Sequence, residues 1–199
     1  MNNCERKKVC ILDYGVGNIT SLKSSLERMG YLVTISNKEK ELEVEEIIFL
    51  PGVGSFPCAM DNLEKLQLDK FLLGCFGKSN KKIIGICLGM QIFFDFSEEG
   101  NRNGLKIIPG KVKKLKNNEC HVGWNIVTPR KSKFLKRKAG FYFNHSFYVD
   151  CAPEYIQGTS KYHNNFATIV KSDNFYGLQF HPEKSQNAGV HILKKIIGD

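Results

Sequence analysis

A cysteine in a glycine-flanked turn is the residue of this sequence best suited to covalent chemistry. The segment Lys81–Ile86 ends in apolar residues and has the length of a strand, and Cys87 follows it between Gly85 and Gly89. Glycines on both sides allow the strained torsions and close packing of a strand-to-helix elbow. The positive end of a helix that begins there favours thiolate over thiol. Cys87 is therefore a candidate nucleophile, with a buried structural cysteine as the alternative when this motif stands alone.

A histidine and a glutamate near the C-terminus supply the groups that a cysteine nucleophile requires. His181 and Glu183 are separated only by Pro182. The histidine would act as the base, and the carboxylate would fix its tautomer and stabilise the imidazolium. The run 177–181 is typical of a strand, in which residues two apart face the same side, so we expect both side chains to point toward one site. Together the two motifs favour a Cys87-His181-Glu183 triad over a surface histidine-glutamate pair.

The loop after a second apolar strand offers hydrogen-bond donors for a developing negative charge. Ile47–Leu50 runs into Pro51-Gly52-Val53-Gly54, and the glycines beside Val53 allow its peptide N–H to turn toward a ligand. Thioester chemistry passes through oxyanions that need two such donors, and the other is the N–H of Leu88 beside the nucleophile. We expect the oxyanion hole at Val53, Gly54 and Leu88. An ordinary strand-ending turn is the alternative.

These three segments resemble those of the class I, triad-type glutamine amidotransferases. Further segments resemble one branch of that family, the glutaminase subunits that serve imidazole glycerol phosphate synthases in histidine biosynthesis, and the similarity covers essentially all 199 residues. The resemblance implies a three-layer, flavodoxin-like α/β fold with a central, mostly parallel mixed sheet and helices on both faces. It implies hydrolysis of glutamine to glutamate and ammonia, with no cofactor. The further segments are 13–18, 121–125 and 141–148.

The resemblance also implies roles for residues outside the triad. Gln91, one helical turn after Cys87, and Glu99 would bind the amino acid end of glutamine. The backbone around Gly54, Ser146 and Phe147 would complete the pocket. Without the resemblance, Gln91 is typical of a plain helix residue and Glu99 of an exposed loop acid. The implied partner is a (β/α)8-barrel cyclase subunit that receives the ammonia in a heterodimer, contacted at or near Asn18, Trp124, Tyr142 and Lys184.

A few residues depart from the pattern usual in this family. Cys120 stands where proline is usual, and Asn144 and Phe147 stand where valine and tyrosine are usual. These departures leave open a paralogous glutaminase that feeds a different synthase, such as one that amidinates a cell-surface sugar. A cysteine peptidase with the same elbow often has histidine after the cysteine, where this chain has Leu88. An intact triad argues against a non-catalytic scaffold.

Composition and charge narrow the class of protein further. With 199 residues and 42% hydrophobic content, the chain is long enough for a single domain, 1–199, with a sizeable core. No apolar run reaches the ~20 residues of a membrane span, so we expect a soluble, cytoplasmic protein. Seven scattered cysteines without zinc spacing indicate reduced thiols and no metal. The net charge is +9. The basic segments contain no interleaved aromatic residues and no nucleic-acid-binding motif, so we expect a solvated basic surface and no binding of nucleic acid.

Strands and helices, the elements that must position these residues, alternate in the first half of the chain. Such alternation predicts a parallel sheet covered by helices on both faces. The expected strands are Val9–Leu12, Tyr31–Ser36 and Ile47–Leu50, and the expected helices are Asn18–Met29, Pro57–Leu66, Leu68–Phe76 and an apolar helix after the elbow that includes Met90 and Phe94. The second half predicts an antiparallel or mixed extension, with strands at Lys111–Leu115, Phe141–Phe143, Tyr155–Thr159, Phe166–Val170 and Tyr176–His181 and a closing helix at Gly189–Ile197.

Overall fold

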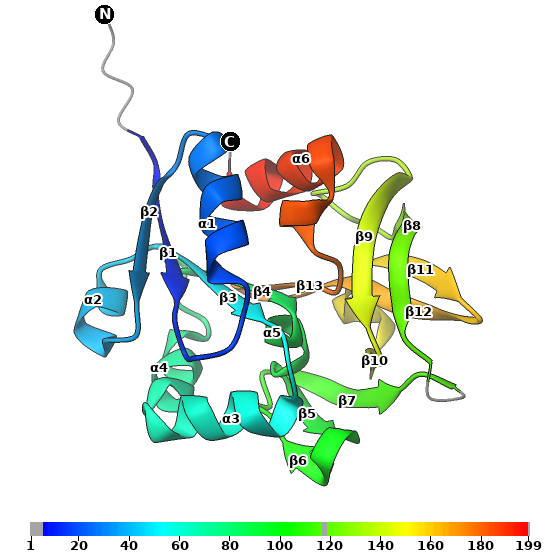
Figure 1. Ribbon diagram of the computed structural model, residues 1–199, viewed down its shortest axis with the longest axis horizontal. Coiled ribbons are helices and arrows are strands. Elements are labelled where there is room, and N and C mark those ends of the chain that lie inside the picture. The colour runs from blue at the N-terminus through cyan, green and yellow to red at the C-terminus, as the bar shows by residue number, and fades with distance from the viewer. Residues whose placement is uncertain (1–5, 117–118, 199) are drawn as a thin grey trace, which may run out of the picture.

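A mixed sheet runs through the centre of the molecule (Figure 1), for which the computed structural model describes residues 6–116 and 119–198. The strand order along the sheet is β2-β1-β3-β4-β13-β12-β10-β7-β5-β6. The first five strands in this order are parallel to one another. They are β2 (Leu32–Ser36), β1 (Lys8–Leu12), β3 (Ile47–Gly52), β4 (Lys82–Cys87) and β13 (Phe175–Leu178).

Beyond β13 the sheet continues mainly through antiparallel pairs. β12 pairs antiparallel with β13 and β10, and β10 pairs antiparallel with β7, whereas β5 and β7 are parallel. A branch leaves β12 through β11 and β8 to β9. The strands of this half are β5 (Phe94–Ser97), β6 (Arg102–Asn103), β7 (Ile108–Lys114), β8 (His121–Pro129), β9 (Ala139–His145), β10 (Phe147–Cys151), β11 (Ile156–Tyr162) and β12 (Asn164–Ser172).

Helices cover both faces of the parallel half, as expected. On one face, α1 (Ile19–Arg28) and α6 (Gln186–Ile197) contribute Leu26 and Ile192 to a buried cluster with strand residues such as Phe49. On the other face, α3 (Phe56–Lys65) and α4 (Leu68–Cys75) pack Leu63 and Phe71 into a second cluster. The expected three-layer α/β architecture is confirmed. The short helices are α2 (Glu39–Glu43), α5 (Leu88–Gln91) and the 3-10 turns η1 (Glu99–Asn101), η3 (Pro153–Tyr155) and η4 (Pro182–Lys184).

The ends of α1 follow from its local sequence. The side-chain oxygen of Asn18 accepts a hydrogen bond from the backbone N–H of Ser21 at 3.2 Å, which caps one of the unpaired donors of the first turn. Gly30 follows the helix with a φ of 95°, a conformation that costs glycine little. The observed bounds agree with the expected helix at Asn18–Met29 within one residue at each end. None of the described helices is long and apolar enough to cross a membrane.

Two expected elements are wrong in extent. The helix after the elbow ends at Gln91, and Phe94 begins β5. The reason is that the carbonyls of Ile92, Phe93 and Phe94 accept hydrogen bonds from residues 105–107, so they are satisfied without a helix. The last predicted strand also ends early.

That strand is β13, which stops at Leu178, so His181 and Glu183 do not share a strand face. Pro182 instead starts the η4 turn, which carries Glu183. Strands β8 and β10 were not predicted as separate elements. Most of the other predicted elements agree with the observed ones within a few residues.

Candidate active site

The elbow that carries Cys87 lies at the end of the central strand β4. Cys87 pairs with Gly52 of β3 and has φ 55° and ψ −110°, a strained conformation for a residue with a side chain. A Cβ atom on Gly89 would collide with the backbone oxygen of Leu50, and one on Gly85 with that of Gly89. The two glycines are therefore required by close packing, and they hold the sulfur above the sheet edge at the start of α5.

The η4 turn brings His181 and Glu183 together at this edge. The Nδ1 atom of His181 lies 2.9 Å from Oε1 of Glu183, and their side chains are only 4% and 3% exposed. Backbone bonds fix the turn on β9, since the N–H of His181 donates to the carbonyl of Tyr142 at 2.8 Å. The predicted contact is therefore present, although a turn and not a strand produces it.

The charge state of His181 suits a cysteine nucleophile. Burial disfavours the charged ring, but hydrogen bonds with Cys87 and Glu183 outweigh burial and raise the pKa of His181 to about 10. At neutral pH the ring is therefore an imidazolium held between a sulfur and a carboxylate. An imidazolium beside a cysteine is the arrangement that favours attack by the sulfur on an acyl carbon.

A cavity of about 290 Å³ opens in front of Cys87. It brings together residues from both halves of the chain, including those expected for the oxyanion hole and those that the family resemblance implied for glutamine binding. A much smaller crevice of about 10 Å³ lies on the side of His181 and Glu183 and is also lined by Asn18 and Val53. The residues that line the larger cavity are Val53, Gly54, Cys87, Leu88, Gln91, Glu99, Cys120, Asn144, His145, Ser146 and Phe147.

The side chain of Gln91 is held in a single orientation on the cavity wall. Its Nε2 donates to the carbonyl of Phe147 at 2.9 Å and to Oε1 of Gln179 at 3.1 Å. Both amide hydrogens are thus engaged, and the oxygen Oε1 is the group that Gln91 offers to a ligand. Gln91 is therefore a buried, hydrogen-bonded residue of the cavity wall, which a plain helix residue would not be.

Gln179 is a site residue that the sequence reasoning missed. It is fully buried, and its Nε2 lies 3.8 Å from Sγ of Cys87. The signal was present, because an amide side chain sits between the apolar residues Leu178 and Phe180 in a segment that leads to His181. A buried amide there needs polar partners, and the nucleophile and Gln91 are those partners.

Glu99 lies on the cavity wall but also has a structural role. Its Oε2 accepts a hydrogen bond from the backbone N–H of Phe56 at 2.9 Å, at the start of α3. A carboxylate is favourable at that helix end. Glu99 is half-buried, so the alternative of an exposed loop acid is wrong.

The loop expected to form the oxyanion hole is anchored at its base. The buried hydroxyl of Tyr14 donates to the carbonyl of Pro51 at 2.6 Å. Beyond this anchor, Val53 is exposed and Gly54 has a φ of 110°. Leu88, the first residue of α5, presents a backbone N–H that no earlier helical turn can satisfy. The predicted donors thus border one cavity.

Two of the residues that depart from the family pattern lie beside the nucleophile. The backbone oxygen of Asn144 lies 3.7 Å from Sγ of Cys87. The side-chain oxygen of Asn144 lies 3.9 Å from Sγ of Cys120. Cys120 and Asn144 therefore form part of the cavity wall. All six cysteines among the described residues are free thiols, as the sequence predicted.

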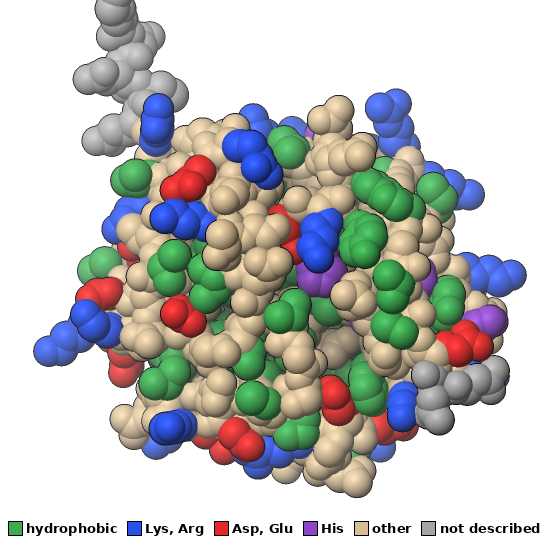
Figure 2. Space-filling view, in the orientation of Figure 1, with side chains coloured by type: hydrophobic (Ala, Val, Ile, Leu, Met, Phe, Trp, Pro, Cys, Tyr) green, Lys and Arg blue, Asp and Glu red, His purple; other side chains and the backbone are tan. Residues whose placement is uncertain are grey.

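An apolar stripe borders the site on the outer face of β8. Val122, Trp124 and Ile126 alternate along the strand and are all more than half exposed. The indole of Trp124 contacts the ring of Tyr142 edge-on, at 6.3 Å between centroids, and Nζ of Lys184 lies 5.6 Å from the centre of the same ring. Hydrophobic side chains gather over β8 and β9 in Figure 2. Exposed apolar stripes of this kind mark protein interfaces.

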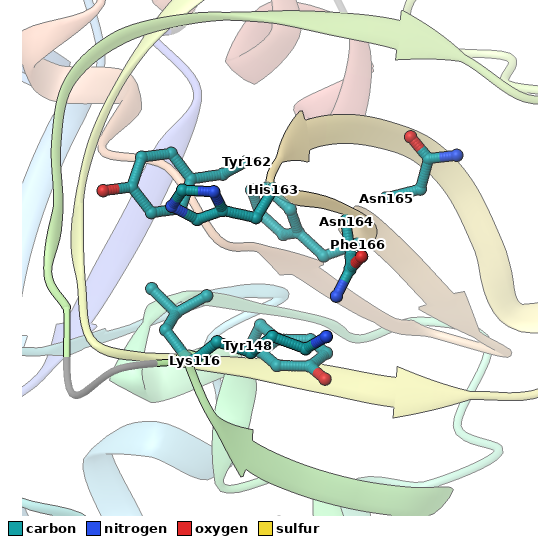
Figure 3. A pocket seen from close by; sticks show the side chains of 8 residues that line it. Lys116, Tyr148, Tyr162, His163, Asn164, Asn165 and Phe166 are labelled. Carbon is teal, nitrogen blue, oxygen red and sulfur yellow. The ribbon is translucent and has the colours of Figure 1, made fainter.

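Other features are less suited to chemistry. Among residues 6–116 and 119–198 no three side chains are grouped as ligands for a metal ion. A recess between Tyr148 and Tyr162, shown in Figure 3, holds only about 20 Å³, which suits a single water molecule. Lysines and arginines are spread over the face of the molecule that Figure 2 shows. The active-site cavity is thus the best candidate for substrate binding.

Comparisons with known proteins agree with this geometry. The family model for class I glutamine amidotransferases matches residues 10–197. Subunit HisH of imidazole glycerol phosphate synthase from Staphylococcus aureus is 39% identical over 191 residues, which cover 95% of this chain and 96% of the relative. The HisH subunit from Bacillus cytotoxicus is 39% identical over 197 residues, covering 96% and 94%.

Solved structures show the same fold at lower identity. PurLQS from Thermotoga maritima superimposes with a TM-score of 0.78 at 16% identity, covering 96% of this chain and 98% of that one. A crystal structure of a glutamine amidotransferase superimposes with a TM-score of 0.76 at 14% identity, covering 96% and 100%. At these identities the match speaks for the fold alone.

Proposed function

The chain belongs to the class I glutamine amidotransferase family, and from that premise we propose that it is the glutaminase subunit of an imidazole glycerol phosphate synthase. It hydrolyses glutamine to glutamate and ammonia for histidine biosynthesis. The observation that carries the chemistry is the buried pair of His181 and Glu183, 2.9 Å apart at Nδ1 and Oε1, next to Cys87 and a cavity of about 290 Å³. The full-length similarity to two HisH subunits supports the choice of pathway.

The first half of the reaction releases ammonia. The thiolate of Cys87 attacks the side-chain amide carbon of glutamine, and the carbonyl electrons move onto oxygen. The N–H groups of Leu88 and of Val53 or Gly54 stabilise this oxyanion. His181 gives its proton to the departing nitrogen, the C–N bond breaks, and a γ-glutamyl thioester remains on Cys87.

The second half regenerates the enzyme. His181, now neutral, takes a proton from water as the water attacks the thioester, and the same donors stabilise the second oxyanion. The C–S bond breaks, glutamate leaves and the thiolate–imidazolium pair is restored. Glu183 orients the imidazole throughout. Gln91 and Glu99 bind the amino acid end of the substrate, with the backbone of Gly54, Ser146 and Phe147.

The ammonia requires an acceptor close by, because in water it becomes ammonium and loses its nucleophilicity. We propose that a (β/α)8-barrel cyclase subunit docks on the apolar stripe of β8 and receives it. Two observations support this face. First, the exposed Trp124 contacts Tyr142, and Tyr142 lies near Lys184, the residue next to Glu183 in the chain. Second, the small crevice that His181 and Glu183 line is also lined by the exposed Asn18.

The test is glutamate release from glutamine by the purified protein, alone and with the cyclase subunit of the same genome loaded with its ribonucleotide substrate. We expect strong stimulation by the loaded cyclase. Cys87→Ala and His181→Ala should abolish glutamine hydrolysis, while synthesis from added ammonium salts by the complex stays intact. Hydrolysis that ignores the cyclase would point to a paralogous glutaminase for another synthase. Equal loss of both activities in the variants would contradict the proposed division of labour.

A further inference from the structure

Two buried histidines that the proposed reaction does not use connect the apolar stripe to the cavity. Nδ1 of His121 on β8 lies 3.0 Å from Nε2 of His145 on β9. Nδ1 of His145 lies 2.8 Å from the carbonyl oxygen of Phe147. At the other end, Nδ2 of Asn125 lies 3.2 Å from Nε2 of His121. Four residues thus form one continuous chain of hydrogen bonds.

The chemistry of these groups fixes the direction of the chain. A carbonyl oxygen only accepts, so Nδ1 of His145 carries the proton, and its bare Nε2 accepts from Nδ1 of His121. The bare Nε2 of His121 then accepts from the amide of Asn125, whose second hydrogen goes to the carbonyl of Lys161 at 3.0 Å. Burial lowers the pKa of His121, and burial lowers that of His145 to about 3, so both rings stay neutral near pH 7 and keep this order.

The chain does not end at Phe147. The carbonyl of Phe147 also accepts a hydrogen bond from the side-chain amide of Gln91. The same amide donates its other hydrogen to Oε1 of Gln179. The amide of Gln179 in turn lies within hydrogen-bond distance of the sulfur of Cys87. A displacement of His145 would therefore move the carbonyl that orients Gln91. Gln91 is in turn a wall residue of the glutamine cavity.

The outer end of the chain lies on the strand that carries the apolar stripe. Asn125 is the neighbour of Trp124 and points to the opposite side of β8. His121 is also tightly packed, stacked between the rings of Phe143 and Tyr162 at 4.8 and 4.3 Å. Tyr162 at the end of β11 and Phe166 on β12, both labelled in Figure 3, contact the ring of His121. The rings cannot shift independently of β8 and β9, because buried side chains in contact move together.

We propose that His121 and His145 are positioning residues that hold the glutamine pocket through the Phe147 carbonyl and couple that pocket to β8. The inference rests on the proposed glutaminase function. A partner that binds Trp124 changes the position of β8, and the chain transmits this change to Gln91. Coupling between two sites requires such a physical connection between them, and the connection must be tested by measuring both ends.

The experiment compares four variants for KM and kcat with glutamine, alone and with the loaded cyclase. His145→Leu breaks the chain, and His145→Gln keeps a donor for Phe147 and an acceptor for His121. Asn125→Leu breaks the outer end far from the substrate. His191→Leu, an exposed histidine on α6, is the matched control. Circular dichroism and the melting temperature show whether each variant is folded.

We expect His145→Leu to raise KM for glutamine three- to tenfold, the effect of about one lost hydrogen bond, with a smaller change in kcat. His145→Gln should restore KM to within about twofold of the wild type. Asn125→Leu should lower the stimulation by the cyclase without lowering the affinity of the complex. The control should match the wild type.

Wild-type KM in His145→Leu, or full stimulation in Asn125→Leu, would overturn the inference while leaving the glutaminase function intact. So would a His145→Gln variant as impaired as His145→Leu, because packing and not the hydrogen bonds would then matter. A wild-type protein that hydrolyses no glutamine under either condition would overturn the proposed function itself, and this inference with it. The two failures are therefore distinguishable.

Discussion

Replacement of the exposed Trp124 by alanine tests the proposed docking face most directly. A tryptophan side chain buries up to about 250 Å² on full burial, and 54% of Trp124 is exposed in the free subunit. Roughly 130 Å² is thus available to a partner. At about 25 cal/mol per Å², its loss corresponds to about 3 kcal/mol, which is a change of about two orders of magnitude in Kd.

The affinity is measured by isothermal titration calorimetry of the subunit with the cyclase. The wild type offers a second signal, since Trp124 is its only tryptophan and its fluorescence should shift to the blue on binding. Phe76→Ala is the matched control: Phe76 is 46% exposed and contacts Phe175 near the start of β13, away from the apolar stripe. An affinity of Trp124→Ala within twofold of the wild type would refute the reasoning, as would an equal loss in Phe76→Ala.

Three further predictions concern the triad and its elbow. Glu183→Gln should lower kcat for glutamine by about 10³–10⁴-fold without unfolding the protein, and a single-turnover assay that shows wild-type acylation would contradict this role. Gly89→Ala should abolish activity and lower the melting temperature strongly, because its methyl group would collide with the backbone oxygen of Leu50; a soluble, active variant would show that the elbow is more adaptable than its packing implies. Between pH 6.5 and about 10 the folded protein keeps a proton on His181 that the unfolded chain releases, so this group makes the free energy of unfolding decrease as pH rises, by at most ~1.4 kcal/mol per pH unit. Urea titrations across this range should show a shallower decrease for His181→Asn than for the wild type.

The triad was predictable because each of its motifs has a local signature. The glycines on both sides of Cys87 predict an elbow. The proline between His181 and Glu183 is typical of the start of a short turn. Their meeting is a property of the topology, because the parallel neighbours β4 and β13 end at the same edge of the sheet. The alternation of strands and helices predicted such an edge. It did not predict that a 3-10 turn, and not a strand, aligns the histidine with the glutamate.

The features that could not be predicted from the sequence depend on contacts between segments that are far apart in the chain. The helix after Cys87 stops early because residues 105–107 supply donors to the carbonyls of 92–94, and no periodicity within the segment records that. Strand β8 was missed because its pattern is inverted, with Val122 and Trp124 facing outward and His121 inward. That inversion is what the proposed docking face on β8 leads us to expect. Gln179 and His145 gain their importance from partners that are far away in sequence.

The position of Cys120 has a consequence for chemical probes of this protein. Its sulfur borders the same cavity as that of Cys87. A small electrophile that enters the cavity therefore meets two thiols, and two labels per site do not indicate non-specific damage. The rate of inactivation, and not the number of labels, reports on Cys87. A bifunctional reagent that bridges the two sulfurs would discriminate between this subunit and relatives that lack the second thiol, and would be a starting point for a selective inhibitor.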